Sequence, residues 1–162
     1  MQGHHVAVGL NGTPASFDAV RWAAWASQET RVPLRVVHVF TTEPWPEKDR
    51  TEFRTASESW HRSQATGWLR AALDDSDSLA AGNRLELREG SWPEVLLGAT
   101  RPDTAFVVLG MTPDAVRQVS AHATRLRCPV VLVPATTTAA DDSEGETTQA
   151  QSCHSRPVGV SR

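Results

Sequence analysis

The feature that most constrains the fold is a fivefold alternation of short β-rich runs with amphipathic stretches. The runs 36–40 and 106–109 are almost continuously apolar, as expected for central parallel strands that helices cover on both faces. Residues 85–88 alternate between apolar and charged side chains instead, which predicts an edge strand with one face in water. The pattern indicates a parallel, doubly wound α/β sheet with right-handed crossovers. The five expected strands are His4–Leu10, Leu34–Phe40, Arg84–Glu89, Ala105–Gly110 and Pro129–Pro134.

Proline and capping signals mark the expected helix starts. Thr13-Pro14 and Thr112-Pro113 are each typical of an N-cap followed by a first helical residue. Ser91-Trp92-Pro93-Glu94 has the pattern of a capping box, and a further helix is predicted from Glu52 to Leu73. Apolar periodicity predicts that the following residues face the core: Ala19, Trp22, Ala23 and Ala26, then Phe53, Ala56, Trp60, Gly67 and Ala71, and finally Val116, Val119, Ala123 and Leu126.

The composition changes at Ala135, which divides the 162 residues into one domain, 1–134, and a tail, 135–162. The tail is polar and acidic with few apolar residues, and this composition predicts disorder. Cys153 and His154 in the tail are too few ligands to predict a metal site. The second cysteine, Cys128, is far away in sequence, so the cysteines predict neither a disulfide framework nor zinc.

The charge balance and the apolar runs exclude several classes of partner. The net charge is −3, which gives no general electrostatic reason to bind nucleic acid or an anionic membrane. No apolar run approaches the roughly 18 residues of a spanning helix. No secretory signal is visible at the amino terminus either, so a cytoplasmic protein is expected.

The residues give little support to an enzyme. No Gly-x-Ser-x-Gly elbow, Walker lysine loop or metal-spaced histidine cluster occurs, and we predict no catalytic residue and no metal. His38 falls in an apolar strand, and a structural role is expected for it. A phosphorylated receiver domain would need clustered acids at the strand ends, but Asn11 and Gly90-Ser91 stand there.

The loop Gly9-Leu10-Asn11-Gly12-Thr13-Pro14, between the first strand and the first helix, is the best local candidate for a ligand site. Doubly wound sheets bind ligands at the carboxyl ends of their strands, where the strand order reverses. Glycines there allow close backbone approach, and a helix N-terminus favours an anion. Alternatively, Asn11-Gly12 makes a tight turn and Thr13 caps the helix.

Five segments of the chain carry a resemblance to a known family: Val6–Ser16, Arg21–Ala24, Leu34–Phe40, Glu89–Leu97 and Cys128–Val133. They occur in the same order in the universal stress protein (UspA-like) family, which the chain resembles over residues 4–134. The resemblance implies a three-layer α/β/α sandwich with a five-stranded parallel sheet of order 3-2-1-4-5, the adenine nucleotide alpha hydrolase-like fold. It also implies a bacterial, cytoplasmic homodimer that pairs through the last strand, residues Val130, Val131, Leu132 and Val133.

Many members of this family bind ATP, and the resemblance implies where this chain would do so. The nucleotide-binding positions would be Gly9, Asn11, Gly12, Thr13, Val39, Gly110, Met111 and Arg117. Asn11 stands where ATP-binding relatives carry an acidic residue, and the backbone of Val39 would face the adenine.

The family's phosphate loop, Gly-x2-Gly-x9-Gly-Ser/Thr, is degenerate here. Gly110 is present, but no glycine follows from Met111 through Glu144. The terminal Gly-Ser pair would fall on Val116-Arg117. Arg117 would offer a charge to one phosphate; alternatively, it is a solvated surface arginine. We therefore expect the loop to be deleted, Thr112-Pro113 to cap the helix directly, and ATP binding to be weak or absent.

Two hypotheses remain. In the first, the chain is a non-catalytic stress-response module that dimerises, binds an unidentified protein partner and needs no cofactor. In the second, it is an adenine-nucleotide-binding stress sensor with a non-standard phosphate loop, using Asn11, Gly12, Val39 and Gly110. ATPase activity would belong to the second hypothesis, but no general base or metal ligand is visible for it.

Overall fold

The computed structural model describes residues 4–41, 50–73 and 83–136. Its elements are β1 (His5–Gly9), α1 (Pro14–Thr30), β2 (Leu34–Phe40), α2 (Arg50–Ala72), β3 (Arg84–Glu89), α3 (Trp92–Ala99), β4 (Thr104–Gly110), α4 (Pro113–His122) and β5 (Val130–Val133). A short 3₁₀ helix, Ala123–Arg125, follows α4. All strand pairs are parallel, and the order is β3-β2-β1-β4-β5, which confirms the predicted sheet.

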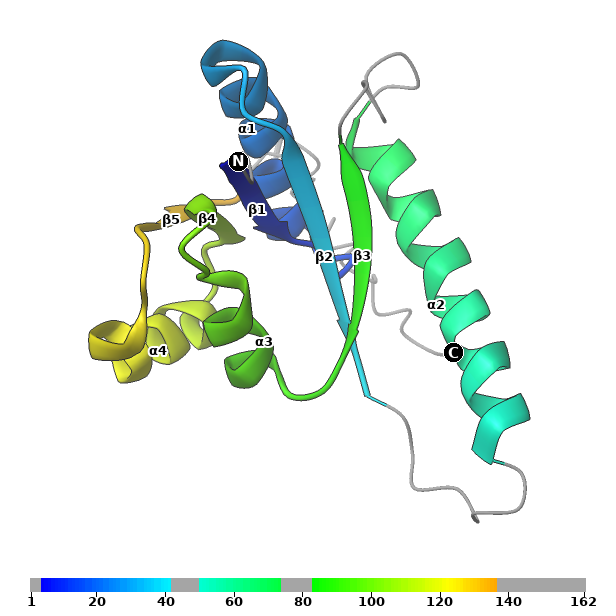
Figure 1. Cartoon of the computed structure of the whole chain (residues 1–162). Coiled ribbons are helices and arrows are strands. Elements are labelled where there is room, and N and C mark those ends of the chain that lie inside the picture. The colour runs from blue at the N-terminus through cyan, green and yellow to red at the C-terminus, as the bar shows by residue number, and fades with distance from the viewer. Residues whose placement is uncertain (1–3, 42–49, 74–82, 137–162) are drawn as a thin grey trace, which may run out of the picture.

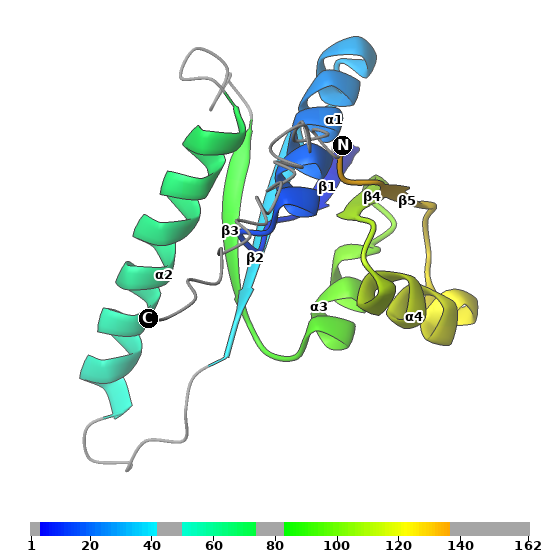
Figure 2. The same cartoon turned by 180° about the vertical axis from the view of Figure 1, so that it is seen from behind.

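Helices cover both faces of the sheet, so the molecule has the predicted three layers (Figures 1 and 2). Alternate residues of β1 point to opposite faces, as in any strand. Val6 and Val8 belong to a buried cluster with residues of α1 and α2, whereas Ala7 belongs to a second cluster with Leu96 of α3. β4 divides in the same way, with Val108 in the first cluster and Val107 in the second. Burial on both sides explains why the run 106–109 is almost continuously apolar.

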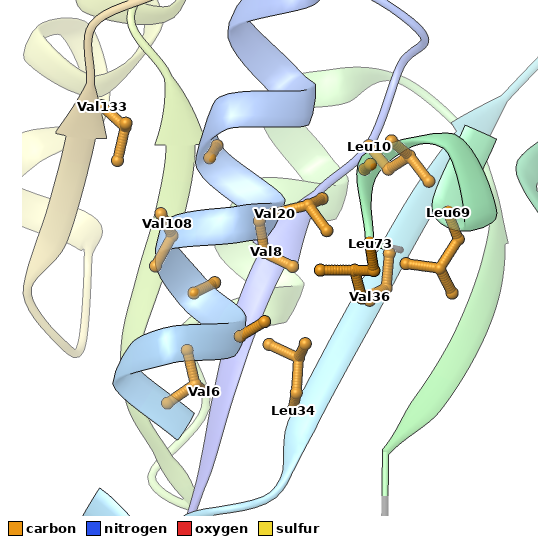
Figure 3. Close-up of a cluster of buried hydrophobic side chains, with 14 residues drawn as sticks. Val6, Val8, Leu10, Val20, Leu34, Val36, Leu69, Leu73, Val108 and Val133 are labelled. Atoms are coloured by element: carbon orange, nitrogen blue, oxygen red, sulfur yellow. The ribbon is translucent and has the colours of Figure 1, made fainter. Parts of the chain in front are cut away.

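The larger core lies between the sheet and the pair α1 and α2. Figure 3 shows valines of β1 and β4 facing α1, with Leu69 and Leu73 at the C-terminal end of α2 beside Leu34 and Val36 of β2. Alanines of α1 let its backbone approach the sheet closely, because Ala19 and Ala23 are fully buried. This packing fixes the N-terminal end of α1 against the carboxyl ends of β1 and β4.

The predicted apolar stripe of α2 is wrong. Ala56, Trp60, Gly67 and Ala71 are exposed, and the side chain of Phe53 lies outside the description. The buried face is instead Ala65, Leu69 and Ala72, on the same side of the helix as His61. His61 stacks on Phe40, and because a histidine counts as polar in a periodicity pattern, the pattern misplaces the buried face.

The predicted stripe of α4 is partly wrong. Val119 and Leu126 pack against the second core cluster, as expected. Val116, however, is 41% exposed, and its neighbour Ala115 is buried in its place. Ala123 is also exposed, because the α-helix ends at His122 and the following 3₁₀ turn changes the helical period.

The two edge strands of the sheet agree with the prediction from the sequence better than the helix stripes do. β3 is an edge strand, as its alternation predicts, and β5 forms the other edge. After β5 the chain is tied back to α1, because Asp18 accepts hydrogen bonds from the backbone N–H and the hydroxyl of Thr136 at 2.7 and 2.8 Å. These bonds lower the pKa of Asp18. Residues 137–162, the rest of the predicted disordered tail, lie outside the described residues.

Candidate functional site

A cavity of about 370 Å³ opens at the carboxyl ends of the strands. It lies where β1 neighbours β4, so the chain order in the sheet reverses beside it. Its volume is at the lower end of the roughly 300–1,000 Å³ that small-molecule sites occupy. Residues from all strand ends except that of β5 line it, including Gly9, Leu10, Val39, Phe40, Thr41, Gly90, Leu109 and Gly110.

Three helices begin at this cavity. The N-cap residues Thr13 of α1, Ser91 of α3 and Thr112 of α4 all line it. Each helix has a proline in its first turn, as the sequence predicts. The predicted capping box is present at α3, where the Glu94 carboxylate accepts hydrogen bonds from the hydroxyl and the backbone N–H of Ser91 at 2.8 and 3.4 Å.

Hydrogen bonds within the β1–α1 loop hold its shape. The side-chain oxygen of Asn11 accepts from the backbone N–H and the hydroxyl of Thr13 at 3.2 and 2.7 Å. The Thr13 hydroxyl oxygen in turn accepts from the N–H of Ser16 at 3.3 Å. The turn therefore has the predicted Asn-Gly and N-cap chemistry, with Asn11 organising it through its carbonyl oxygen.

The glycines at the site are required by neighbouring protein atoms. A Cβ on Gly9 would lie 2.8 Å from the indole of Trp92, and one on Gly110 would lie 2.5 Å from the backbone of Ala15. Gly12 has a φ of +79°, and a Cβ there would lie 2.6 Å from the indole of Trp68. Close packing of α1, α3 and α2 thus accounts for all three residues without a ligand.

The connection from β4 to α4 is very short. β4 ends at Gly110 and α4 begins at Pro113, so Met111 and Thr112 alone join them. The Thr112 hydroxyl accepts from the N–H of Ala115 at 3.1 Å, which is the direct capping that the sequence predicts. On the first turn, Asp114 lines the cavity and pairs with the guanidinium of Arg117.

The structure brings together five of the eight residues that the sequence predicts for nucleotide binding. Gly9, Asn11, Thr13, Val39 and Gly110 line the same cavity. The other three lie outside its lining: Gly12 faces Trp68, Met111 is 46% exposed, and Arg117 pairs with Asp114. Several residues that line the cavity were not predicted from the sequence, namely Ser16, Phe40, Thr41, Trp92, Asp114 and Ala115. The sequence held a signal that could have identified them, because each lies at the end of a strand or in the first turn of a helix.

A pair of histidines lies behind the loop. His38 is buried, and its Nδ1 lies 2.9 Å from the carbonyl oxygen of Leu10, so Nδ1 carries the proton. Its Nε2 lies 3.4 Å from Nδ1 of His61. Burial, and to a lesser degree His38, lowers the pKa of His61. Since the hydrogen bonds of His38 are made within the protein, the structural role expected for it agrees with this geometry.

At the opposite end of the sheet, Thr104, His5 and Asp103 have the order of a nucleophile, a base and an acid. Thr104 Oγ1 lies 3.1 Å from His5 Nε2, and His5 Nδ1 lies 3.7 Å from Asp103. The Thr104 hydroxyl, however, donates its proton to the carbonyl of Ala99 at 2.7 Å. His5 and Thr104 are also buried, so the arrangement serves packing rather than nucleophilic attack.

Other chemistry is sparse within the described ranges. No group of three or more His, Cys, Asp or Glu side chains there is placed to hold a metal ion. Cys128 is half-buried, and burial raises the pKa of its thiol, which disfavours the reactive thiolate. Among the same residues, the helices are all too short or too polar to span a membrane.

The family model of the universal stress proteins matches residues 3–134. The chain belongs to the universal stress protein family. This agrees with the resemblance carried by its five sequence segments, and it covers the whole described sheet with its helices. The curated protein sequences give no significant match.

Solved structures of universal stress proteins share the fold. One, from Burkholderia pseudomallei, is 24% identical and covers 83% of this chain and 98% of its own, with a TM-score of 0.58. A universal stress protein in complex with cAMP is 19% identical, covering 84% and 100%, with a TM-score of 0.59. A family protein from Arabidopsis thaliana with AMP bound is 17% identical, covering 83% and 93%, with a TM-score of 0.56.

Proposed function

We propose that this universal stress protein is a non-catalytic stress-response module. It works in the bacterial cytoplasm by forming a homodimer and binding another protein, not a membrane or nucleic acid, and its nucleotide site is weakened on the phosphate side. The observation that carries the weakened site is the two-residue connection between Gly110 and Pro113. A glycine-rich phosphate cradle needs a longer loop whose successive N–H groups point at the ligand.

Edge strand β5 supports the dimer. Its residues Val130, Val131 and Leu132 are only half-buried, and the strand has a neighbour on one side, β4. An apolar edge strand is a template for pairing with another chain. A second copy of β5 would cover this edge and bury the exposed parts of these side chains.

Titration of the dialysed protein with ATP and magnesium in a calorimeter tests the weakened site. We expect no binding heat that fits a low-micromolar dissociation constant, because the protein lacks a loop to hold the phosphates. For the same reason, millimolar ATP should change the melting temperature little. A low-micromolar dissociation constant would contradict the proposal. Release of phosphate from ATP by the purified protein would contradict its non-catalytic part.

The cavity favours a second candidate function, that of an adenine-nucleotide sensor. A cavity of about 370 Å³ lies at the carboxyl ends of β1 and β4, and proteins of the same fold have been solved with cAMP and with AMP bound. In this candidate function, other residues of the protein contact the phosphates in place of the missing loop. Tight ATP binding in the titration above would favour it.

A further inference from the structure

The phosphate side of the cavity is already occupied by hydrogen bonds within the protein. An unoccupied helix start offers backbone N–H groups to an anion. Here the N–H of Ser16 donates to the Thr13 hydroxyl, and the N–H of Ala115 donates to the Thr112 hydroxyl. Each helix also has a proline in its first turn, and proline has no N–H. The three helix starts therefore offer few free donors.

At two of these helix starts, a carboxylate of the protein lies in the positive electrostatic potential of the helix N-terminus. Glu94, in the first turn of α3, accepts from the backbone and the hydroxyl of Ser91. Asp114, in the first turn of α4, lines the cavity itself. A helix N-terminus stabilises a negative charge, and a carboxylate placed there occupies the position that a phosphate would take.

Asp114 is held at this position by Arg117, one turn further along α4. The same contact engages Arg117, the one cation that the sequence analysis assigned to a phosphate, and Arg117 lies outside the cavity lining. Of the cavity's described lining residues, Asp114 is the one that carries a charge. Its carboxylate repels an anion that enters beside it.

The other side of the cavity suits an uncharged aromatic ring. The indole of Trp92 forms part of its wall against Gly9, and Val39, Phe40 and Leu109 add apolar surface. The hydroxyl group of Thr41 supplies a polar contact of the kind that sugar hydroxyls take. Apolar walls with a few placed polar groups are typical of small-molecule sites.

We propose that the cavity binds an uncharged purine nucleoside, such as adenosine, in preference to its 5′-phosphates. The proposal rests on the proposed function, in which the adenine side of the site is retained and the phosphate side is weakened. The preference comes from Asp114 and from the capped helix starts, which penalise a phosphate and leave the nucleoside unaffected.

Titration of the ¹⁵N-labelled protein with adenosine, AMP and ATP, followed by amide chemical shifts, tests the proposal because it reports affinities up to the millimolar range. We expect adenosine to shift amides at Gly9, Gly90 and Gly110 and to bind about fivefold more tightly than AMP, the size of a screened repulsion between nearby charges. ATP is expected to bind more weakly than AMP. The ratio should fall at high salt, which screens the repulsion.

Two variants should move the adenosine-to-AMP ratio in opposite directions. Asp114→Asn removes the carboxylate and should bring the two affinities within about twofold of each other. Arg117→Gln leaves the carboxylate uncompensated and should widen the difference. Glu29→Gln is the matched control, because it removes the same charge from an exposed position near the C-terminal end of α1 and should leave the ratio unchanged.

The outcomes distinguish this proposal from the proposed function. Tighter adenosine binding that becomes equal to AMP binding in Asp114→Asn supports the preference. AMP binding as tight as adenosine in the unaltered protein overturns it, and so does a ratio that Asp114→Asn leaves unchanged. If none of the three ligands shifts an amide, the preference is overturned, while the non-catalytic module stands. Low-micromolar ATP binding overturns both.

Discussion

Gly110 illustrates how a motif residue acquires its meaning from its neighbours. The resemblance to the family implies a nucleotide-binding position at Gly110, and Gly110 does line the cavity. Its Cα, however, also faces the first turn of α1, where a Cβ would lie 2.5 Å from a backbone carbon of Ala15. This glycine at a strand end therefore has a packing reason that holds whether or not a ligand binds.

We expect Gly110→Ala to lower the free energy of unfolding by at least about 2 kcal/mol, because the added methyl group collides with backbone that cannot rotate away. Gly98→Ala is the matched control. Gly98 lies in α3 with no atom within 4 Å of its added Cβ, so the same change should stabilise the protein by about 0.5–1 kcal/mol through helix propensity. Urea unfolding measures both, and equal effects would contradict the packing argument.

At the scale of elements, α2 shows where periodicity misleads. Among the described side chains of α2, the buried ones lie in the C-terminal half and pack on the same side as a histidine, whereas the predicted stripe followed other residues along the whole helix. α1 was predicted correctly because its buried alanines repeat at helical spacing. Its two buried serines, Ser16 and Ser27, lie in the first and last turns, where their hydroxyls donate to backbone carbonyls. Capping signals were more reliable than stripes, since a cap depends on neighbours within one turn.

The packing of α2 on β2 and the position of His5 in β1 make stability depend on pH. Burial lowers the pKa of both His61 and His5 from the ordinary 6.5. Between the lowered values and 6.5, the unfolded chain binds more protons than the folded protein, so the free energy of unfolding falls as the pH is lowered through this window.

Urea unfolding between pH 5 and 8 measures this dependence. His61→Phe keeps a ring on Phe40 but cannot take up a proton, so its stability should depend less on pH, with a remainder from His5. Trp60→Phe changes the exposed neighbour and should leave the pH dependence as it is. An unchanged dependence in His61→Phe would show that the α2 packing is not responsible.

At the scale of the whole molecule, the two sheet edges differ in character. β3 carries charged residues, and Glu86 pairs with Arg35 and with Arg88. β5 is entirely apolar, four residues from Val130 to Val133. Charged side chains protect an edge against pairing with another chain, so an association through the sheet is expected at β5 rather than β3.

We expect Val131→Lys to convert the proposed dimer to monomers in sedimentation velocity, because a lysine at this edge would place a charge against the second copy of β5. Leu85→Lys is the matched control. Leu85 and Val131 both pack against the larger core cluster, but Leu85 lies on β3, at the other edge of the sheet. Circular dichroism checks that both variants fold. A dimer that survives Val131→Lys would rule out the β5 interface.

The sequence by itself determined the layers, the strand order through the family segments, the helix starts and the shortened connection after β4. The layers, the helix starts and the connection depend on hydrophobic period, on capping within one turn and on chain length, which are local properties. The strand order, in contrast, came from the resemblance to the family. The tertiary structure decided which helix starts converge on one cavity, why Gly9, Gly12 and Gly110 are glycines, and that Asp114 lines this cavity at the start of α4. These features join residues about 100 positions apart, such as Asn11 and Asp114, and only packing brings such residues together.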